Sequence, residues 1–153
     1  MKKTIFVLKL MLIMMFATAN HSVGNEQEKS NGKIIVKIEG LNSSEGVLRS
    51  HLYNNAKYFP IECDYAVRKC VAKISNNKAE IVYENVPYGT YALTVHHDAN
   101  NNGKMDRNFI GYPQEGFGVS NNPRIMLSLP NYEDCKFILN SETKTIIVKL
   151  KFT

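Results

Sequence analysis

Apolar and polar residues alternate in several short runs of this chain, and a period of two is typical of a strand with one buried face. In the first run, Ile34, Val36 and Ile38 alternate with charged residues and should point into a core. The runs, separated by turn residues, cover residues 33–41, 47–53, 71–74, 78–86, 90–97, 136–139 and 145–152. No long amphipathic helical pattern accompanies them. The pattern predicts an all-β fold: an antiparallel β-sandwich of about seven strands, of the immunoglobulin or prealbumin kind.

The later runs predict part of the core and one connection. The residues expected to point inward from them are Tyr91, Leu93, Val95, Ile146, Val148, Leu150 and Phe152. Between the runs 78–86 and 90–97 stands Pro87-Tyr88-Gly89, and proline followed closely by glycine is typical of a turn. We therefore expect these two strands to form a hairpin.

The first 19 residues have the order of a secretory signal peptide. Lysines precede an apolar stretch of about 12 residues, 5–16, and Ala17-Thr18-Ala19 offers a small-residue cleavage site. Lys9 interrupts that stretch, which is shorter than the roughly 20 apolar residues of a membrane-spanning helix. We expect cleavage of residues 1–19, a flexible leader over 20–32, and a sandwich domain over 33–153 in the periplasm or outside the cell, with no transmembrane segment.

Composition fits one globular domain and argues against nucleic acid as a partner. Apolar residues make up 44% of the chain and charged residues 22%, which is enough apolar content for a single core. The formal charge is +5, but three lysines lie in the predicted signal peptide, so the exported chain would carry only +2. The other lysines alternate with apolar residues, as on the solvated face of a strand.

The chain has three cysteines, and an oxidising compartment permits a disulfide. Cys63 and Cys70 bracket six residues of a predicted loop, a separation that a disulfide can close if the loop turns back. We predict this pair. Cys135 is then left free, and an unpaired cysteine in a strand is typically a small buried apolar residue rather than a reactive thiol.

Residues 98–106 carry oxygen-bearing side chains at alternate positions, followed by a glycine. Calcium takes six to eight oxygen ligands, and a spacing of two lets a tightly coiled loop turn successive carboxylates and amides inward. Gly103 would supply the sharp turn. The predicted ligands are the side chains of Asp98, Asn100, Asn102 and Asp106 and the backbone carbonyl of Lys104.

This calcium site should be weak. The position where a helix-loop-helix calcium hand has its bidentate glutamate is Phe109, and only two formal charges remain. We expect a dissociation constant of about 10⁻⁴ to 10⁻³ M unless Glu115 or another acid completes the site. The alternative is that Asp98 and the asparagines make Asx turns that shape the loop without any metal.

Two neighbouring histidines precede the loop. His96 and His97 stand next to each other in a predicted strand, so their side chains should point to opposite faces and cannot readily share one metal. His97 falls on the core face beside Val95, and we expect it to be a structural histidine that holds the loop backbone.

Residues 111–122 are punctuated by glycine and contain two aromatic side chains, Tyr112 and Phe117. They follow no strand-to-helix junction with the spacing of a phosphate loop, so a nucleotide site is not predicted. Two interpretations stay open for the aromatic residues. They line a groove for a sugar or peptide, or they cover an edge of the sandwich.

A run of motifs in this region resembles a known family. The residues are His97-Asp98-x-Asn100-x-Asn102-Gly103-Lys104-x-Asp106 and Phe109-x-Gly111-x-Pro113-x-Glu115-Gly116-x-Gly118-x-Ser120-Asn121, with Pro87-Tyr88-Gly89-Thr90-Tyr91-Ala92 upstream. They resemble an exported bacterial family known only as domain of unknown function 2141, over residues 33–152. The resemblance implies a sandwich and export, and it implies no activity, cofactor or catalytic residue.

Three functions fit these observations. The leading interpretation is a non-catalytic binding or adhesion module of the cell envelope, with an envelope protein or a glycan as partner. The second is a structural envelope scaffold that meets a protein partner along a strand edge and binds no small ligand. The third is a metal-assisted hydrolase using Asp98 and Asp106, but it lacks a placed base, and Ser120 has no evident histidine partner. We therefore expect no enzymatic activity.

Overall fold

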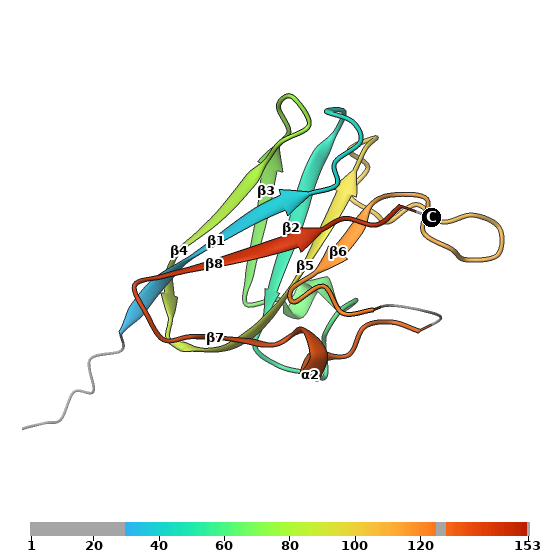
Figure 1. The fold of residues 1–153 in the computed structure, drawn as a ribbon. Helices are drawn as coiled ribbons and strands as arrows, with labels where there is room; N and C mark the ends of the chain where they lie inside the picture. The colour runs from blue at the N-terminus through green and yellow to red at the C-terminus, as the bar shows by residue number, and fades with distance from the viewer. Residues whose placement is uncertain (1–29, 125–127, 153) are drawn as a thin grey trace, which may run out of the picture.

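The structure is a computed structural model that describes residues 30–124 and 128–152 (Figure 1). The predicted signal peptide, residues 1–19, and nearly all of the predicted leader lie outside the described residues. The first strand begins at Asn31, two residues before the expected start of the domain. Within the described ranges, no helix has the length and apolar character needed to cross a bilayer.

Eight strands of the described part form two sheets (Figure 1). The three-stranded sheet has the order β4-β1-β8, with β4 at Glu80–Pro87, β1 at Asn31–Glu39 and β8 at Thr143–Lys149. The five-stranded sheet has the order β3-β2-β5-β6, with β7 also paired to β5. Its strands are β2 (Val47–Tyr53), β3 (Arg68–Lys73), β5 (Gly89–Asp98), β6 (Phe117–Val119) and β7 (Phe137–Leu139). Two short helical elements are η1 (Cys63–Tyr65) and α2 (Tyr132–Cys135).

The main core lies between the two sheets and confirms the predicted β-sandwich. Its buried residues that were expected from the alternation are Ile34, Val36, Tyr91, Leu93, Val95, Ile146, Val148 and Leu150. Phe152 was expected to point inward as well, but it is 37% exposed. The reason is that β8 ends at Lys149, so the alternation of the strand does not extend to Phe152.

One strand pair departs from a purely antiparallel arrangement. β1 and β8 run parallel, in a continuous register from Lys33 opposite Thr143 to Glu39 opposite Lys149. The preceding strand, β7, belongs to the other sheet, so residues 140–142 carry the chain across the sandwich before β8 begins. This crossing allows β8 to enter the three-stranded sheet in the same direction as β1.

The predicted hairpin of β4 and β5 is wrong. β4 pairs with β1, whereas β5 pairs with β2, β6 and β7, so the two strands lie in different sheets. Tyr88 stands between them, and its backbone N–H donates to the carbonyl of Ser30, 2.9 Å away, instead of closing a hairpin. The Pro87-Tyr88-Gly89 turn therefore passes the chain from one layer to the other.

A second apolar cluster covers the outer face of the five-stranded sheet. Its buried residues are Tyr53, Phe59, Ala92, Val119, Tyr132 and Cys135. Ala92 lies between Tyr91 and Leu93 of the main core, and successive side chains of a strand point to opposite faces. Residues 54–66 and α2 therefore bury part of a face that a two-layer sandwich would leave to solvent.

The sequence did not predict β6. Its residues lie between the predicted strands 90–97 and 136–139, where no strand was expected, and β6 spans only Phe117–Val119. A side chain at Gly118 would place its Cβ 2.6 Å from Val148 Cγ1, so only glycine lets β6 approach β8 this closely. The loop that carries the candidate site therefore ends where β6 begins and covers residues 99–116.

Candidate functional site

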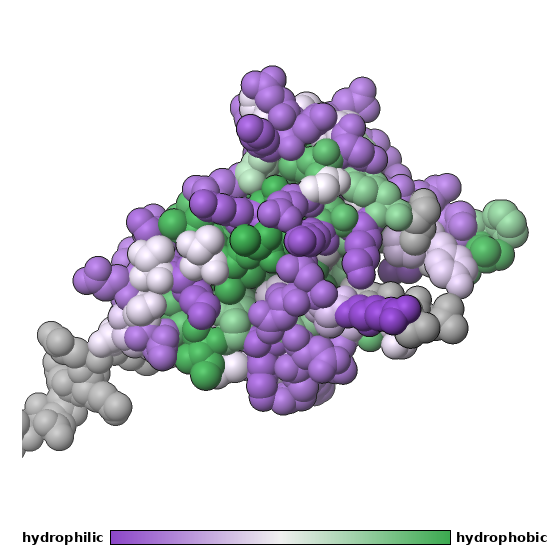
Figure 2. Space-filling model, viewed as in Figure 1, coloured by the Kyte–Doolittle hydropathy of each residue, from purple (hydrophilic) through white to green (hydrophobic). Residues whose placement is uncertain are grey.

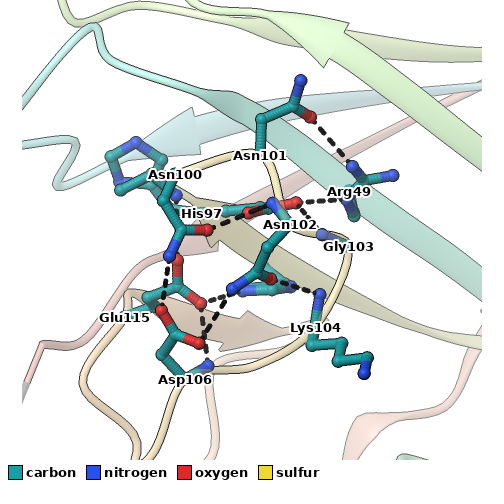
Figure 3. Close-up of polar contacts among 12 residues, drawn as sticks. Arg49, His97, Asn100, Asn101, Asn102, Gly103, Lys104, Asp106 and Glu115 are labelled. Carbon is teal, nitrogen blue, oxygen red and sulfur yellow. Dashed lines mark hydrogen bonds and ion pairs between the residues drawn. The ribbon is translucent and has the colours of Figure 1, made fainter.

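The candidate site is the Asn-rich loop, residues 99–116, which joins β5 to β6 and folds back on the end of β5 (Figure 3). Asp98, the last residue of β5, is fully buried. Its Oδ1 accepts a hydrogen bond from the N–H of Asn102 at 3.0 Å, and its Oδ2 accepts one from the N–H of Gly103 at 2.9 Å. Gly103 has a φ of +80°, a left-handed conformation that glycine adopts without strain.

Arg49 on β2 neutralises Asp98. The guanidinium Nε lies 2.5 Å from Asp98 Oδ2, and the Nη2 group donates to Asn101 Oδ1 at 2.9 Å. Burial alone would raise the pKa of the Asp98 carboxyl, but hydrogen bonds from Arg49, Gly103 and Asn102 hold that pKa below its usual value. The sequence did not point to Arg49, because its place beside Asp98 depends on the register of β2 against β5.

The structure brings together three of the five predicted calcium ligands. The side-chain nitrogens of Asn100 and Asn102 lie 2.6 and 2.9 Å from the two carboxylate oxygens of Asp106. The side-chain oxygen of Asn100 accepts the N–H of Asn102, and that of Asn102 accepts the N–H of Lys104. Each asparagine thus bonds the backbone two residues ahead, as in the Asx turns of the metal-free alternative.

This polar cluster has few charged ligands for a metal. In the described ranges, no group of three or more His, Cys, Asp or Glu side chains is placed to hold a metal ion. The Asp98 carboxylate faces Arg49, and amide nitrogens face the carboxylate of Asp106 (Figure 3). A cation here would depend on amide and backbone oxygens beside two aspartates, one of which is already paired with an arginine.

Glu115 ties the two ends of the Asn-rich loop together. This buried carboxylate accepts the N–H of Ala99 on Oε1 at 2.9 Å and the N–H of Asp106 on Oε2 at 3.0 Å. Oε2 also lies 2.7 Å from Nε2 of His96, which is buried on the outer face of the sheet. Glu115 had been considered as a further metal ligand, and its oxygens instead hold two backbone amides and an imidazole.

The two histidines point to opposite faces of β5, as expected. His96 meets Glu115, whereas Nε2 of His97 lies 2.9 Å from the carbonyl oxygen of Glu45, to which it donates. The ring of Phe152 meets His97 edge-on at 6.0 Å between centroids. His97 is therefore a buried structural histidine, and the backbone it holds belongs to the turn before β2 rather than to the Asn-rich loop.

The tip of the Asn-rich loop is a tight turn built by Asn108. The Asn108 side-chain oxygen accepts the N–H groups of Ile110 and Tyr112 at 3.1 and 2.9 Å. The backbone of Asn108 also bonds that of Tyr112 and Gly111, each at 2.9 Å. Between these anchors Phe109 is 98% exposed and Ile110 is 63% exposed. Figure 2 shows a hydrophobic knob at the right of the molecule, where the loop between β5 and β6 extends in Figure 1.

The two aromatic residues of the glycine-punctuated stretch have different environments. Phe117 is half-buried on β6 and packs against the second apolar cluster, so it covers an edge of the sandwich. Tyr112 stands at the base of the loop tip with 48% of its surface exposed. The two rings therefore do not form one groove.

All three cysteines are free in the structure, so the predicted pair of Cys63 and Cys70 is not formed. Cys63 Sγ lies 3.8 Å from the hydroxyl of Tyr53, beside the second apolar cluster, whereas Cys70 packs against the main core. Burial raises the pKa of the Cys70 thiol and raises that of Cys135 to about 11. Neither thiol is activated as a nucleophile.

Ser120 serves the backbone of the sandwich. Its buried hydroxyl donates to the carbonyl of Cys135 at 2.6 Å and accepts the N–H of Leu93 at 3.0 Å. Both hydrogen-bond partners of the hydroxyl are therefore backbone groups, and the hydroxyl links β5 to the segment before β7.

These features define a β-sandwich domain with one long loop that is held by buried polar bonds and ends in an apolar tip. Residues 36–147 match the family model described as uncharacterized protein conserved in bacteria (DUF2141), and the chain belongs to that family. Searches of curated proteins and of solved structures found no match.

Proposed function

We propose that the protein is an exported, non-catalytic binding module of the cell envelope, and that the tip of the Asn-rich loop is its contact element. The observation that carries this proposal is the 98% exposure of Phe109 at the end of an ordered turn. An exposed phenylalanine side chain does not stabilise the fold, because apolar surface stabilises a protein only when it is removed from water. An ordered, exposed apolar tip suits a partner that buries it.

The base of the loop supports this role. Glu115 holds the backbone at Ala99 and at Asp106, and Asp98 holds it at Asn102 and Gly103. These bonds order the loop before any partner arrives. Preorganisation favours affinity because less conformational freedom is lost on binding.

The state of the reactive side chains supports a non-catalytic module. The Ser120 hydroxyl is engaged by two backbone groups, and the thiol of Cys135 is buried with a raised pKa. His96 and His97 face opposite layers and each has a structural partner. A hydrolase would need a nucleophile or metal-bound water beside a placed base.

We further propose that the loop binds calcium weakly. Rotating the amide groups of Asn100 and Asn102 exchanges nitrogen for oxygen, and it gives up the hydrogen bonds that these oxygens accept from the N–H groups of Asn102 and Lys104. The rotated amides would direct two oxygens to the same point as the Asp106 carboxylate. Arg49 opposes this, because its positive charge already neutralises Asp98. The resulting affinity should be low, because the ion must compensate for the lost hydrogen bonds of the two Asx turns.

The scaffold alternative rests on the edge of the five-stranded sheet. β3 is an edge strand, and Val71 in its middle is 57% exposed. Lys69 and Lys73 stand on either side of it in the same strand and face, and lysines on an edge strand discourage pairing with another chain. Phe109 at the loop tip is 98% exposed, against 57% for Val71, so the tip is the better candidate for the contact.

The proposal is tested by fractionating cells that produce the protein or a variant. We expect the wild-type protein to be exported and retained with the envelope fraction, and Phe109→Ser to release most of it without lowering its melting temperature. Ile138→Ser is the matched control, because Ile138 is a 58% exposed apolar residue on β7. Retention that survives Phe109→Ser and is lost with Val71→Lys would establish the edge-strand scaffold instead.

A further inference from the structure

The turn at the loop tip satisfies much of its own backbone hydrogen bonding. The N–H groups of Ile110 and Tyr112 donate to the Asn108 side chain, and the N–H of Gly111 donates to the Asn108 carbonyl. The carbonyls of Tyr112 and Gly111 accept from the Asn108 N–H and from a guanidinium N–H of Arg107, each at 2.9 Å. These polar groups therefore do not need water.

Self-contained bonding matters when a segment leaves water. A backbone polar group that enters an apolar phase without a partner costs several kcal/mol, and this cost excludes most irregular loops from lipid. The tip avoids part of this cost, since several of its backbone groups are bonded within the turn while the side chains of Phe109 and Ile110 are exposed. In a loop that contacts only water, the polar groups would be exposed and the apolar side chains buried.

The exposed charged side chains of the loop are both cationic. Lys104 and Arg107 are exposed on the loop, and Arg107 uses one of its five N–H donors for the Gly111 carbonyl. The two acids of the loop are less accessible: the Asp106 carboxylate is partly buried and accepts hydrogen bonds from the amides of Asn100 and Asn102, and Glu115 is buried. The knob is therefore apolar at its end and cationic at its sides.

We propose that this tip inserts into the interfacial layer of a bilayer that contains anionic phospholipids. The inference rests on the proposed function and names the partner of the same loop. Phe109 and Ile110 would enter the boundary between headgroups and acyl chains, while Lys104 and Arg107 meet lipid phosphates. Tyr112, half-exposed below them, has the amphipathic ring that is enriched at this depth.

The shape of the site favours a bilayer over a protein. The apolar surface is a convex projection from one end of the sandwich (Figures 1 and 2), and a soft headgroup layer accepts such a projection without a matching cavity. Two apolar side chains and two cations give a weak attachment. We expect an affinity no greater than that of a single myristoyl chain, about 10⁴ M⁻¹.

The chain contains no tryptophan, which makes a direct test possible. Phe109→Trp places the sole indole of the protein at the tip. We expect its emission to shift to the blue on vesicles of phosphatidylethanolamine with phosphatidylglycerol, and to be quenched by brominated acyl chains. The shift should be smaller on phosphatidylcholine alone and should fall as salt screens the lysine and arginine. Ile138→Trp, on β7, is the control and should show neither effect.

Two further variants quantify the insertion. In the Phe109→Trp protein, Ile110→Ser should weaken vesicle binding by about tenfold or more, as expected for the loss of one large buried apolar side chain. Lys104→Gln should weaken binding only to the anionic vesicles. An unshifted indole at position 109, or an equal shift at position 138, overturns the membrane proposal.

The cell fractionation separates this failure from that of the proposed function. If the indole at position 109 is unaffected by lipid while Phe109→Ser still releases the protein from the envelope, the tip contacts a protein and only the membrane inference is overturned. If Phe109→Ser also leaves retention unchanged, the loop tip is not the contact element and both proposals are wrong.

Discussion

Arg49 and Asp98 form an ion pair diagonally across the five-stranded sheet, with Nε 2.5 Å from Oδ2. The register of β2 against β5 sets Arg49 opposite His96, and Asp98 is two residues further along the same face. The pair closes the base of the Asn-rich loop from the side of β2. It links the order of the loop to the pairing of the two central strands.

Removing Asp98 should destabilise the whole domain. Asp98→Ala leaves the Arg49 guanidinium and two loop amides without their acceptor, and we expect a loss of about 2–4 kcal/mol in the free energy of unfolding. Urea denaturation of Asp98→Ala, Arg49→Ala and the double variant measures it. The losses should be strongly non-additive. Additive losses would show that the two side chains act independently.

Glu115→Gln should loosen the loop without unfolding the sandwich. Glutamine has one side-chain oxygen, whereas Glu115 uses both of its oxygens as acceptors for Ala99, Asp106 and His96. We expect a loss of about 1–3 kcal/mol and faster hydrogen exchange at the amides of Ala99 and Asp106. Exchange at the strand amides of β1 should change much less. Equal acceleration in β1 would mean that the loop is not a separate opening unit.

Calcium should raise the melting temperature slightly. Millimolar calcium is about one to ten times the expected dissociation constant, and at that concentration one site adds only about 0.4–1.4 kcal/mol to stability. Thermal melts with chelator and with millimolar calcium measure this for the protein and for Asp106→Asn, which keeps an oxygen but removes one charge. Glu62→Gln, an exposed acid outside the loop, is the control. No rise in the wild-type protein would leave the Asx turns as the full account of the loop.

Stability should fall in mildly acidic solution because of His51. Burial and the positive charges of Lys69, His96 and Arg49 lower its pKa from 6.5 to about 4, against the opposing effect of Asp64. Between pH 6.5 and about 4, His51 is therefore protonated in the unfolded chain and still neutral in the folded protein. The free energy of unfolding decreases as the pH falls from about 6.5, and the loss is complete below about 4.

The His51→Gln variant tests this sign. Its unfolding free energy should depend less on pH over that window than that of the wild-type protein. Denaturant titrations at several pH values give both slopes. If the wild-type protein instead became more stable as the pH falls, this result would contradict the lowered pKa of His51.

Gly118→Ala should weaken the attachment of β6. The added methyl group would lie 2.6 Å from Val148 Cγ1 and 2.9 Å from the Lys149 carbonyl oxygen. Overpacking of this kind costs about 1–3 kcal/mol. In the double variant, Val148→Ala removes the side-chain clash but not the backbone one. Gly118→Ala should therefore cost less stability in the Val148→Ala protein than in the wild-type protein, so stability recovers only in part. Full recovery would show that the backbone there yields easily.

Alternation in the sequence predicted the strands that bury one face. Ile34 and Val36, and likewise Leu93 and Val95, lie in the main core because a period of two survives wherever one side of a strand meets the other sheet. The sheet to which each strand belongs was not predictable in this way. The turn at Tyr88 has the residues of a hairpin, and yet it joins two layers, since turn chemistry is local and strand pairing is not.

The candidate site was likewise predictable only where its contacts are local in the sequence. The Asx turns of Asn100 and Asn102 follow from the sequence because their bonds reach only two residues ahead. Arg49 reaches the loop from β2, and Glu115 bonds Ala99 from the other end of the same loop, so no local pattern marked either as its support. The sequence did not indicate that Phe109 is exposed, because its exposure depends on how Asn108 closes the turn.

The parallel pairing of β1 and β8 bears on how the domain responds to tension. The start of β1 and the end of β8 lie at opposite ends of the sandwich, and the register between them runs unbroken from Lys33 to Glu39. A pull on these two ends acts along the strands and strains their hydrogen bonds together, in shear. Antiparallel terminal strands pulled at adjacent ends would instead separate one bond at a time. A module anchored at one end and held at the other is mechanically strongest in this arrangement.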